Sequence, residues 1–240
     1  MEYGLIIDLE TTGIDPVNDR IIEIGLLQFG MEEGGEPTIT EMYSGLQDPG
    51  QPLLPEIKKI TGLDDVWLKG RAIDWLKVRE FIESSQVLIA HNADFDSKFL
   101  MAMPEMSGLE KHWACSMKHI DWESKGFRTR SLNYLAADHG FVNPFAHRAL
   151  FDCAATFRLI TPYLSELIMG SHQKEFCFYA VNAAFEDKDK LKARRYRWNP
   201  EKKVWYKSIM ENLLEEERAF LRDEIYQGRE FQHKEEEVLN

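Results

Sequence analysis

The sequence predicts an α/β fold, in which helices flank a mixed β-sheet, followed by a small α+β module. Up to about residue 168, strand-like apolar runs come first and then alternate with segments of helical spacing. After the turn-rich residues 170–173, the chain becomes basic and aromatic. We therefore expect one domain at residues 1–169, a module at residues 174–228 and a frayed end at residues 229–240.

The first domain is expected to begin with a β-hairpin. Residues 3–8 and 20–29 are apolar runs rich in Ile and Leu, and the segment between them is dense in turn residues. Residues 38–46 alternate weakly, which predicts an edge strand. Helical spacing of apolar residues follows at residues 54–61 and 73–84.

Strands and helices alternate in the rest of this domain. The run Val-Leu-Ile-Ala within residues 86–91 predicts a fourth strand, which leads directly into a helix from about Asp94. Residues 113–117 predict a fifth strand. Residues 130–139 and 149–167 have the spacing of helices.

The C-terminal module is expected to combine strands and helices in a short length. Residues 175–181 and 204–208 are strand-like, with a turn at Asn199-Pro-Glu-Lys before the second of them. Residues 187–195 are helical in pattern, and residues 211–226 form a clear amphipathic helix.

Size and composition limit the class of protein. A chain of 240 residues with 44% hydrophobic residues can bury a substantial core. No stretch approaches the ~20 apolar residues that a membrane span requires, and the N-terminus lacks the pattern of a signal peptide. The 3 cysteines are widely spaced, which favours reduced thiols over a disulfide framework. We therefore expect a cytoplasmic protein without membrane association.

The distribution of charge is more informative than the net charge of −12. Residues 1–170 hold 15 Lys and Arg against 26 Asp and Glu, whereas residues 188–207 hold nine basic and two acidic residues. Basic residues alternate there with Tyr and Trp, a composition that suits single-stranded nucleic acid, although the aromatic rings could equally form the core of a small module. The candidate contacts are Lys192, Arg194, Arg195, Arg197, Lys202 and Lys203.

Asp8 and Glu10 follow the apolar run Leu-Ile-Ile at the end of the expected first strand. Side chains two positions apart in a strand point to the same face, so both carboxylates can reach one cation. An isolated Asp-x-Glu more often only ends a strand and opens a turn. Carboxylates beside a buried strand, however, are desolvated and repel each other unless a positive group lies between them.

Asp96, His147 and Asp152 complete the candidate set. Asp96 lies just inside the helix after the fourth strand; Asp94 is its alternative, although a helix cap would explain Asp94 equally well. His147 precedes a helix with Asp152 in its first turn, where a loop histidine and a dipole-compensating acid are the ordinary explanations. Together the five residues offer ligands for hard divalent cations and a proton acceptor, as two-metal phosphodiester hydrolysis requires. We interpret the chain as a nuclease.

Three segments also carry a resemblance to a known family. They are Gly4-Leu-Ile-Ile-Asp-Leu-Glu-Thr-Thr-Gly13, His91-Asn-Ala-Asp-Phe-Asp-Ser-Lys-Phe-Leu100 and His147-Arg-Ala-Leu-Phe-Asp152. In this order they resemble the three exonuclease motifs of the DEDDh branch of DnaQ-like 3′→5′ exonucleases. The resemblance covers roughly residues 3–168, and Thr61 departs from the histidine that the family often has there.

The resemblance implies a ribonuclease H-like fold and two divalent cations, Mg²⁺ or Mn²⁺. It makes Asp8, Glu10 and Asp152 direct ligands, with Asp96 holding the second ion. His147 would be the general base, because imidazole can accept a proton from water near neutral pH. The 3′-terminal nucleotide would be bound by Thr11, Thr12, Gly13, Ile14 and Asn92.

The leading interpretation is a metal-dependent 3′→5′ exonuclease that releases nucleoside monophosphates from single-stranded or frayed DNA ends. An exoribonuclease acting on RNA 3′ ends is the alternative, because the family includes both activities. A polymerase-associated proofreading subunit would be expected to carry a flexible or apolar docking tail rather than a basic one. An inactive nucleic-acid-binding scaffold is disfavoured by the intact set of five residues.

Overall fold

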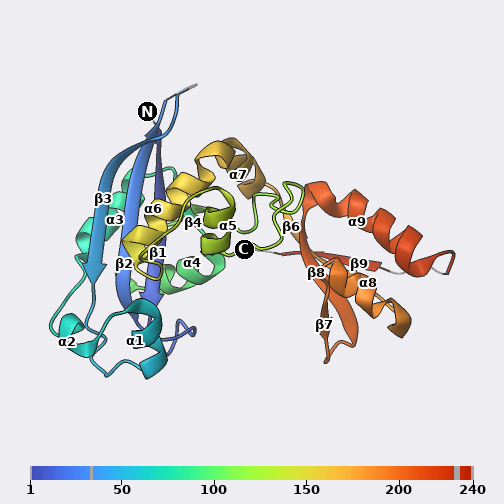
Figure 1. The fold of residues 1–240 in the computed structure, drawn as a ribbon, viewed down its shortest axis with the longest axis horizontal. Helices are drawn as coiled ribbons and strands as arrows, with labels where there is room; N and C mark the ends of the chain where they lie inside the picture. Colours follow the sequence, from blue (N-terminus) through green and yellow to red (C-terminus); the bar gives the residue numbers. More distant parts are fainter. Residues whose placement is uncertain (1, 33–34, 230–232, 239–240) are drawn as a thin grey trace. The chain divides into compact units, whose positions relative to one another are not determined.

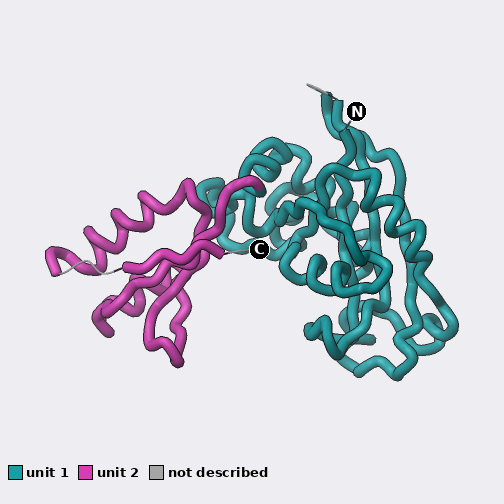
Figure 2. Tube along the Cα trace, turned by 180° about the vertical axis from the view of Figure 1, so that it is seen from behind, with its two compact units in different colours: residues 1–171 teal, residues 172–240 magenta. Residues whose placement is uncertain are grey.

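The computed structural model describes residues 2–32, 35–229 and 233–238. The chain divides into two compact units, Met1–Ser171 and His172–Asn240 (Figures 1 and 2). The predicted fold class is confirmed, since a mixed sheet with helices is followed by a small unit of strands and helices. Within the described part of the chain, no helix is long and apolar enough to cross a membrane.

The first unit is built on a five-stranded sheet in the order β3-β2-β1-β4-β5. β1 pairs antiparallel with β2 and parallel with β4, so the sheet is mixed and β1 lies at its centre. The strands are β1 (Glu2–Thr11), β2 (Ile21–Met31), β3 (Thr38–Leu46), β4 (Val87–Ala90) and β5 (His112–Cys115).

Helices cover both faces of this sheet (Figure 1). Alternation along β1 sends Leu5, Ile7 and Leu9 into a core shared with α3 and α4, and sends Ile6 into a core shared with α5, α6 and α7. The helices are α1 (Pro55–Thr61), α2 (Asp65–Leu68), α3 (Trp75–Ser84), α4 (Ala93–Met101), α5 (Leu132–Asp138), α6 (Ala149–Ile160) and α7 (Leu164–Ser171).

Two details of the first unit differ from the sequence prediction. The single helix expected at residues 149–167 is interrupted by a 3₁₀ turn, Thr161–Tyr163, because Pro162 has no N–H to donate within an α-helix. The short helix α2 was not predicted. Asp64 caps it by accepting a hydrogen bond from the N–H of Trp67 at 2.7 Å.

The second unit has a four-stranded antiparallel sheet in the order β7-β8-β6-β9, with helices α8 and α9. Its core joins Phe178 of the sheet to Leu191 of α8 and Leu221 beyond α9, and it includes Tyr196. Trp198, by contrast, is 48% exposed. The elements are β6 (Glu175–Ala180), α8 (Lys188–Ala193), β7 (Arg197–Asn199), β8 (Val204–Met210), α9 (Leu214–Phe220), a π-helical turn (Leu221–Tyr226) and β9 (His233–Glu237).

The expectation of a frayed end at residues 229–240 is wrong for His233–Glu237, which form β9 and pair antiparallel with β6. The charged sequence of this segment gives no strand signal. Pairing with β6 satisfies the backbone groups along that edge, and two bonds from Arg218 to Glu235, at 2.7 and 2.6 Å, fix the segment further. Residues 230–232 and 239–240 lie outside the described residues.

Candidate active site

A cavity of about 470 Å³ opens where β1 and β4 end, and it collects the residues singled out in the sequence. Parallel strands whose carboxyl ends meet at one edge commonly form ligand sites there. All five candidate residues line this cavity: Asp8, Glu10, Asp96, His147 and Asp152. They come from β1, α4 and the start of α6, which are far apart in the sequence.

Asp8 and Glu10 are two positions apart near the end of β1. Their cross-strand partners on β2 are Gly25 and Glu23. The register shifts between Glu10 and Thr11, so the strand is irregular where the site begins. Alternation brings both carboxylates to one face of the sheet, as their two-residue spacing predicted, and the structure shows that α6 covers this face.

Asp96 is 3% exposed and lies in the first turn of α4, immediately after β4. Its Oδ1 accepts a hydrogen bond from the backbone N–H of Leu9 at 3.0 Å, which ties the helix to the strand that carries the other carboxylates. Asp94, the alternative to Asp96, instead forms an ion pair with Lys118 at 2.7 Å. The N-cap of α4 is Asn92 rather than Asp94.

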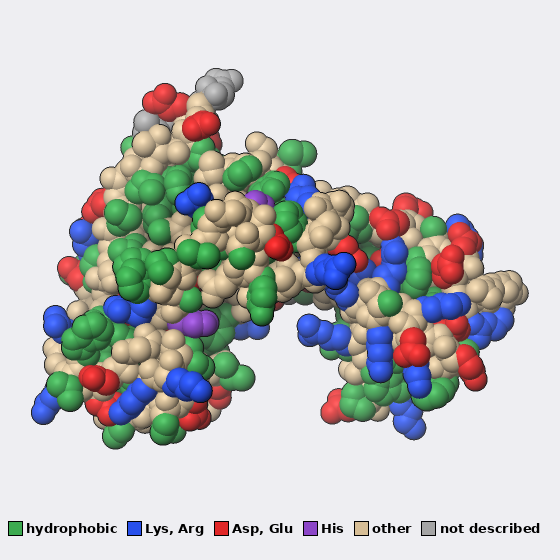
Figure 3. Space-filling view, viewed as in Figure 1, with side chains coloured by type: hydrophobic (Ala, Val, Ile, Leu, Met, Phe, Trp, Pro, Cys, Tyr) green, Lys and Arg blue, Asp and Glu red, His purple; other side chains and the backbone are tan. Residues whose placement is uncertain are grey.

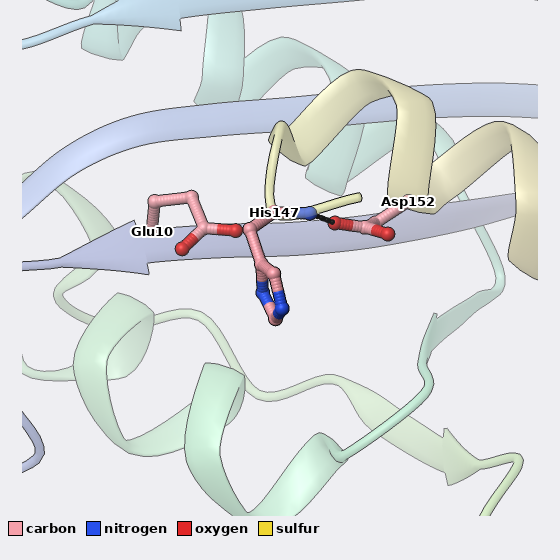
Figure 4. A group of neighbouring side chains, drawn as sticks. All are labelled: Glu10, His147 and Asp152. Atoms are coloured by element: carbon pink, nitrogen blue, oxygen red, sulfur yellow. Dashed lines mark hydrogen bonds between the residues drawn. The ribbon is translucent and has the colours of Figure 1, made fainter. Parts of the chain in front are cut away.

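His147 and Asp152 are joined at the start of α6 (Figure 4). The backbone N–H of His147 donates to Asp152 Oδ2 at 2.7 Å, and Asn143 Nδ2 donates to Oδ1 at 2.7 Å. His147 has a positive φ of 63°, and its side chain is exposed toward the cavity. The Asp152 carboxylate thus fixes both ends of the loop, residues 143–147, that carries His147.

Burial and mutual repulsion raise the pKa values of the carboxyl groups. The pKa of Asp8 lies well above its ordinary value, first because of burial and then because of the charges of Asp96 and Asp152. Burial, followed by the charges of Asp152 and Glu23, raises the pKa of Glu10 to about 8. Burial also raises the pKa of Asp96 to about 8 and raises that of Asp152. Such a group binds protons or a cation more readily than isolated carboxylates do.

The donor set fits a divalent cation. Ligand atoms of Glu10, His147 and Asp152 all lie within 4.8 Å of one another (Figure 4). Carboxylate oxygens are the ligands that Mg²⁺ and Mn²⁺ take from proteins. A positive ion at this point would also relieve the repulsion that raises the pKa of Asp8.

His91 lines the same cavity but has a different environment. It is buried, and its ring nitrogens lie 2.7 Å from the Ser116 hydroxyl and 2.7 Å from the Arg130 carbonyl oxygen. Burial lowers the pKa of His91 to about 4, so its imidazole stays neutral. This histidine therefore fixes the wall of the cavity, whereas His147 presents its ring to the interior.

The residues expected to bind the nucleotide are mostly at this cavity. Thr11, Gly13, Ile14 and Asn92 line it, and Ile14 is 87% exposed. Thr12 is not among the lining residues. Its N–H donates to the Arg20 carbonyl at 2.9 Å and its hydroxyl bonds Asp19 at 2.9 Å, so Thr12 closes the turn before β2.

Other residues of the site were not found from the sequence. Asn143 binds Asp152, and Glu23 is buried beside Glu10. Glu23 had a readable signal, because a glutamate within an Ile-rich strand must have a partner. Asn143 lies in a loop without a motif. The cavity is further lined by Ile57, Ile60, Thr61, Phe95, Ser131, Leu132 and Asn133.

The candidate cations of the second unit have different environments. Lys192, Arg197, Lys202 and Lys203 are exposed. Arg194 pairs with Glu216 at 2.6 Å and with Glu217 at 3.1 Å. Lys202 lies 5.3 Å above the ring of Tyr179, and Arg195 is half-buried with a φ of 68°.

Comparison with known proteins identifies the family to which the first unit is similar. Residues 5–160 match the model of the family described as Exonuclease. The chain belongs to the exonuclease family. It is 30% identical over 168 residues to the DNA polymerase III subunit epsilon of Aquifex aeolicus, covering 68% of this chain and 81% of that protein.

Two further similarities concern this exonuclease unit. Over 156 residues the chain is 32% identical to DNA polymerase III PolC-type of Listeria innocua, which is 63% of this chain but only 10% of that protein. A solved structure of exonuclease X in complex with 5′ overhanging duplex DNA matches with a TM-score of 0.50 and 22% identity. It covers 70% of this chain and 99% of the other, and it shows a shared fold.

Proposed function

We propose that this protein is a metal-dependent exonuclease that removes nucleoside monophosphates from the 3′ end of a DNA strand. The observation that carries the proposal is the meeting of four carboxylates and one exposed histidine in a single cavity. Membership of the exonuclease family supports phosphodiester hydrolysis as the reaction.

We propose that two divalent cations, Mg²⁺ or Mn²⁺, are held by Asp8, Glu10 and Asp152. Asp96 would hold the second of these cations. When bound, the cations would activate water and stabilise charge on the scissile phosphate. Asp96 is held to β1 by its bond from the Leu9 N–H, so its carboxylate keeps a fixed position relative to the other ligands. Metal ligands that are already fixed in position lose little conformational freedom when a cation binds.

His147 is proposed to accept the proton of the attacking water. Its ring is exposed toward the cavity, while its backbone is bonded to Asp152 at 2.7 Å. The side chain can therefore reach a water molecule without losing its position. A positioned imidazole is the commonest general base near neutral pH.

The 3′-terminal nucleotide is proposed to lie against Thr11, Gly13, Ile14 and Asn92. Ile14 offers an exposed apolar side chain that can contact a base, and Asn92 offers an amide. Neither contact distinguishes DNA from RNA. DNA is preferred here because the similar proteins are named as parts of DNA polymerase III.

The second unit is proposed to bind the single strand that leads to the 3′ end. Lys and Arg side chains of this unit gather over α8 and the β7–β8 hairpin (Figure 3). Exposed Lys192, Arg197, Lys202 and Lys203 can neutralise phosphates, and half-exposed Trp198 can stack on a base. Arg194 is a weaker candidate for this role, because its guanidinium already pairs with Glu216 and Glu217.

A polymerase-associated proofreading role is the second candidate. The similarity to a DNA polymerase III subunit epsilon over 81% of that protein favours it. A proofreading role uses the same chemistry, so the two candidates differ only in whether a polymerase binds the chain.

Digestion of end-labelled oligonucleotides tests the proposal. Matched DNA and RNA strands carry the label at either end and are incubated with Mg²⁺, Mn²⁺ or EDTA. We expect single-nucleotide shortening from the 3′ end of DNA that stops in EDTA. Shortening from the 5′ end, or activity unaffected by EDTA, would contradict the proposal. Faster digestion of RNA than of DNA would favour the exoribonuclease alternative instead.

A further inference from the structure

An ion pair between buried Glu23 and half-buried Arg148 joins β2 to the start of α6 beside the cavity. Glu23 is 1% exposed. Its carboxylate accepts from Arg148 Nε at 3.1 and 3.2 Å, and from the Arg148 terminal nitrogen Nη2 at 3.1 Å. It also accepts from the backbone N–H of Ala149 at 3.3 Å. A forked arginine–carboxylate pair fixes orientation as well as distance.

The position of Glu23 in the sheet brings this pair to the site. Glu23 is the cross-strand partner of Glu10, and directly paired residues share one face of a sheet. Gly25 lies two positions further along that face. A Cβ there would be 2.4 Å from the backbone carbonyl carbon of Ala149, so α6 begins directly against β2. The ion pair thus holds the first residues of α6 against the strand next to the carboxylates.

His147 requires such support. A φ of 63° is unfavourable for a residue with a side chain, so the surrounding contacts must maintain it. On one side, the His147 N–H is bonded to Asp152. On the other side, the next residue, Arg148, is held by Glu23 and covered by the ring of Trp67, 5.4 Å from the guanidinium carbon.

We propose that Glu23 and Arg148 are positioning residues for His147, which act through the backbone and do not touch the substrate. The pair has opposite charges for a physical reason. Glu23 adds to the repulsion around Glu10, and Arg148 offsets part of it, while Glu23 fixes the guanidinium that anchors the loop. The consequence for catalysis rests on the proposed function, whereas the consequence for loop order does not.

Two variants separate positioning from stability: Arg148→Met, and the double variant that combines it with Glu23→Gln. Arg148→Met should lower both the melting temperature and kcat, because it leaves Glu23 buried without a counter-charge. The double variant removes that charge, so its melting temperature should return toward that of the wild type. Its kcat should nevertheless stay roughly 10- to 100-fold low, with KM within about twofold, because His147 is then held only on the side of Asp152.

Amide hydrogen exchange gives a readout that does not depend on activity. Residues 143–149 of the substrate-free double variant should exchange faster than in the wild type, while α3 is unchanged. The matched control is Arg218→Met with Glu235→Gln, which removes an arginine–glutamate pair with bonds of 2.7 and 2.6 Å in the second unit. It should change neither kcat on a dinucleotide nor exchange at residues 143–149.

Two results would overturn the role of the pair. One is recovery of kcat together with the melting temperature in the double variant, and the other is unchanged exchange at residues 143–149. If the wild-type chain cleaves no nucleic acid, the proposed function fails, and the exchange measurement alone decides whether the pair orders the loop.

Discussion

His147 differs from the carboxylates around it in exposure. Asp96 and Asp152 are 3% and 6% exposed, whereas the imidazole faces the cavity. Burial suits groups that hold cations, and exposure suits a group that exchanges protons with water. The division of roles proposed here follows from that difference.

Replacing His147 by alanine should lower turnover by roughly 10²–10⁴-fold while leaving substrate binding largely intact. The rising limb of the wild-type pH–rate profile should also disappear. Steady-state kinetics on a labelled oligonucleotide between pH 5 and 9 measures both effects, with His172→Ala as the control. Because metal-bound water also titrates, only the comparison between the two proteins is informative. Profiles of identical shape and similar rate would remove His147 from the mechanism.

The stability of the metal-free protein should fall as pH rises. The pKa values of Glu10 and Asp96 are raised to about 8 in the folded chain, whereas unfolded carboxyls titrate near 4. Their contribution to stability is therefore fully present below about pH 4 and is lost as pH rises through 8. Thermal melts in EDTA should show a declining melting temperature over this range, and Glu10→Gln should flatten the decline. A wild-type melting temperature that does not fall, or an unchanged slope in Glu10→Gln, would contradict the crowding of these carboxyls.

At the residue scale, the sequence located the acidic cluster because a two-residue period and three ordered motifs both point to it. It could not show that Arg194 is bound by two glutamates from α9, because those partners lie more than twenty residues away in the chain. For a similar reason it could not show that Thr12 closes the turn before β2. Its bonds to Asp19 and Arg20 depend on how the turn closes.

At the scale of elements, the contact between β2 and α6 determines the site. Gly25 allows the backbone of Ala149 to approach the sheet, and Cys153 Sγ lies 3.2 Å from the Gly25 carbonyl oxygen. The sequence predicted both elements but not their contact. Side-chain periodicity shows which face of a helix is apolar, and it does not show which strand that face meets.

Gly25→Ala should therefore destabilise the chain by about 1–3 kcal/mol, because the added Cβ would overlap the backbone of α6. Displacement of α6 should also lower turnover at temperatures where the variant is folded. Chemical denaturation and oligonucleotide digestion measure the two effects. Gly35→Ala is the control, since its nearest neighbour would be at an ordinary 3.4 Å. Equal stability of the two variants would contradict the close approach.

Two element boundaries show where sequence patterns are insufficient. Apolar spacing continues through residues 149–167, yet Pro162 interrupts the helix because it cannot donate a backbone hydrogen bond. At β9 the error is the opposite one, because a strand forms where the sequence pattern predicts none. Its sequence, His-Lys-Glu-Glu-Glu, is a poor strand former, and its conformation depends on pairing with β6.

For the whole molecule, charge is divided between an acidic first part and a basic segment in the second unit. Residues 1–170 hold 15 basic and 26 acidic residues, so a polyanion is repelled except where cations are bound. Sustained contact with a long strand is expected to use the exposed cations at Lys192, Arg197, Lys202 and Lys203. Composition alone shows that this basic segment exists. Only the structure shows which of its cations are already paired with carboxylates.

Replacing Lys192, Arg197 and Lys203 by glutamate should weaken binding of long single strands and flatten its salt dependence. Each lost phosphate contact lowers the slope of log K against log salt by about 0.7. Cleavage of a dinucleotide should remain unchanged. Fluorescence anisotropy at several salt concentrations measures the slope, with Arg222→Glu, which removes an arginine paired with Asp223, as the control. An unchanged slope would favour a protein partner for the second unit.

Turnover by the Asp8→Asn variant tests the central claim most directly, namely that the crowded carboxylates perform metal-dependent hydrolysis. Asparagine keeps the shape of the side chain but removes a charge that the neighbouring carboxylates already repel. The variant should fold with an equal or higher melting temperature in EDTA, yet hydrolyse a labelled oligonucleotide roughly 10³-fold or more slowly with Mg²⁺. A folded Asp8→Asn variant with near wild-type turnover would contradict the account.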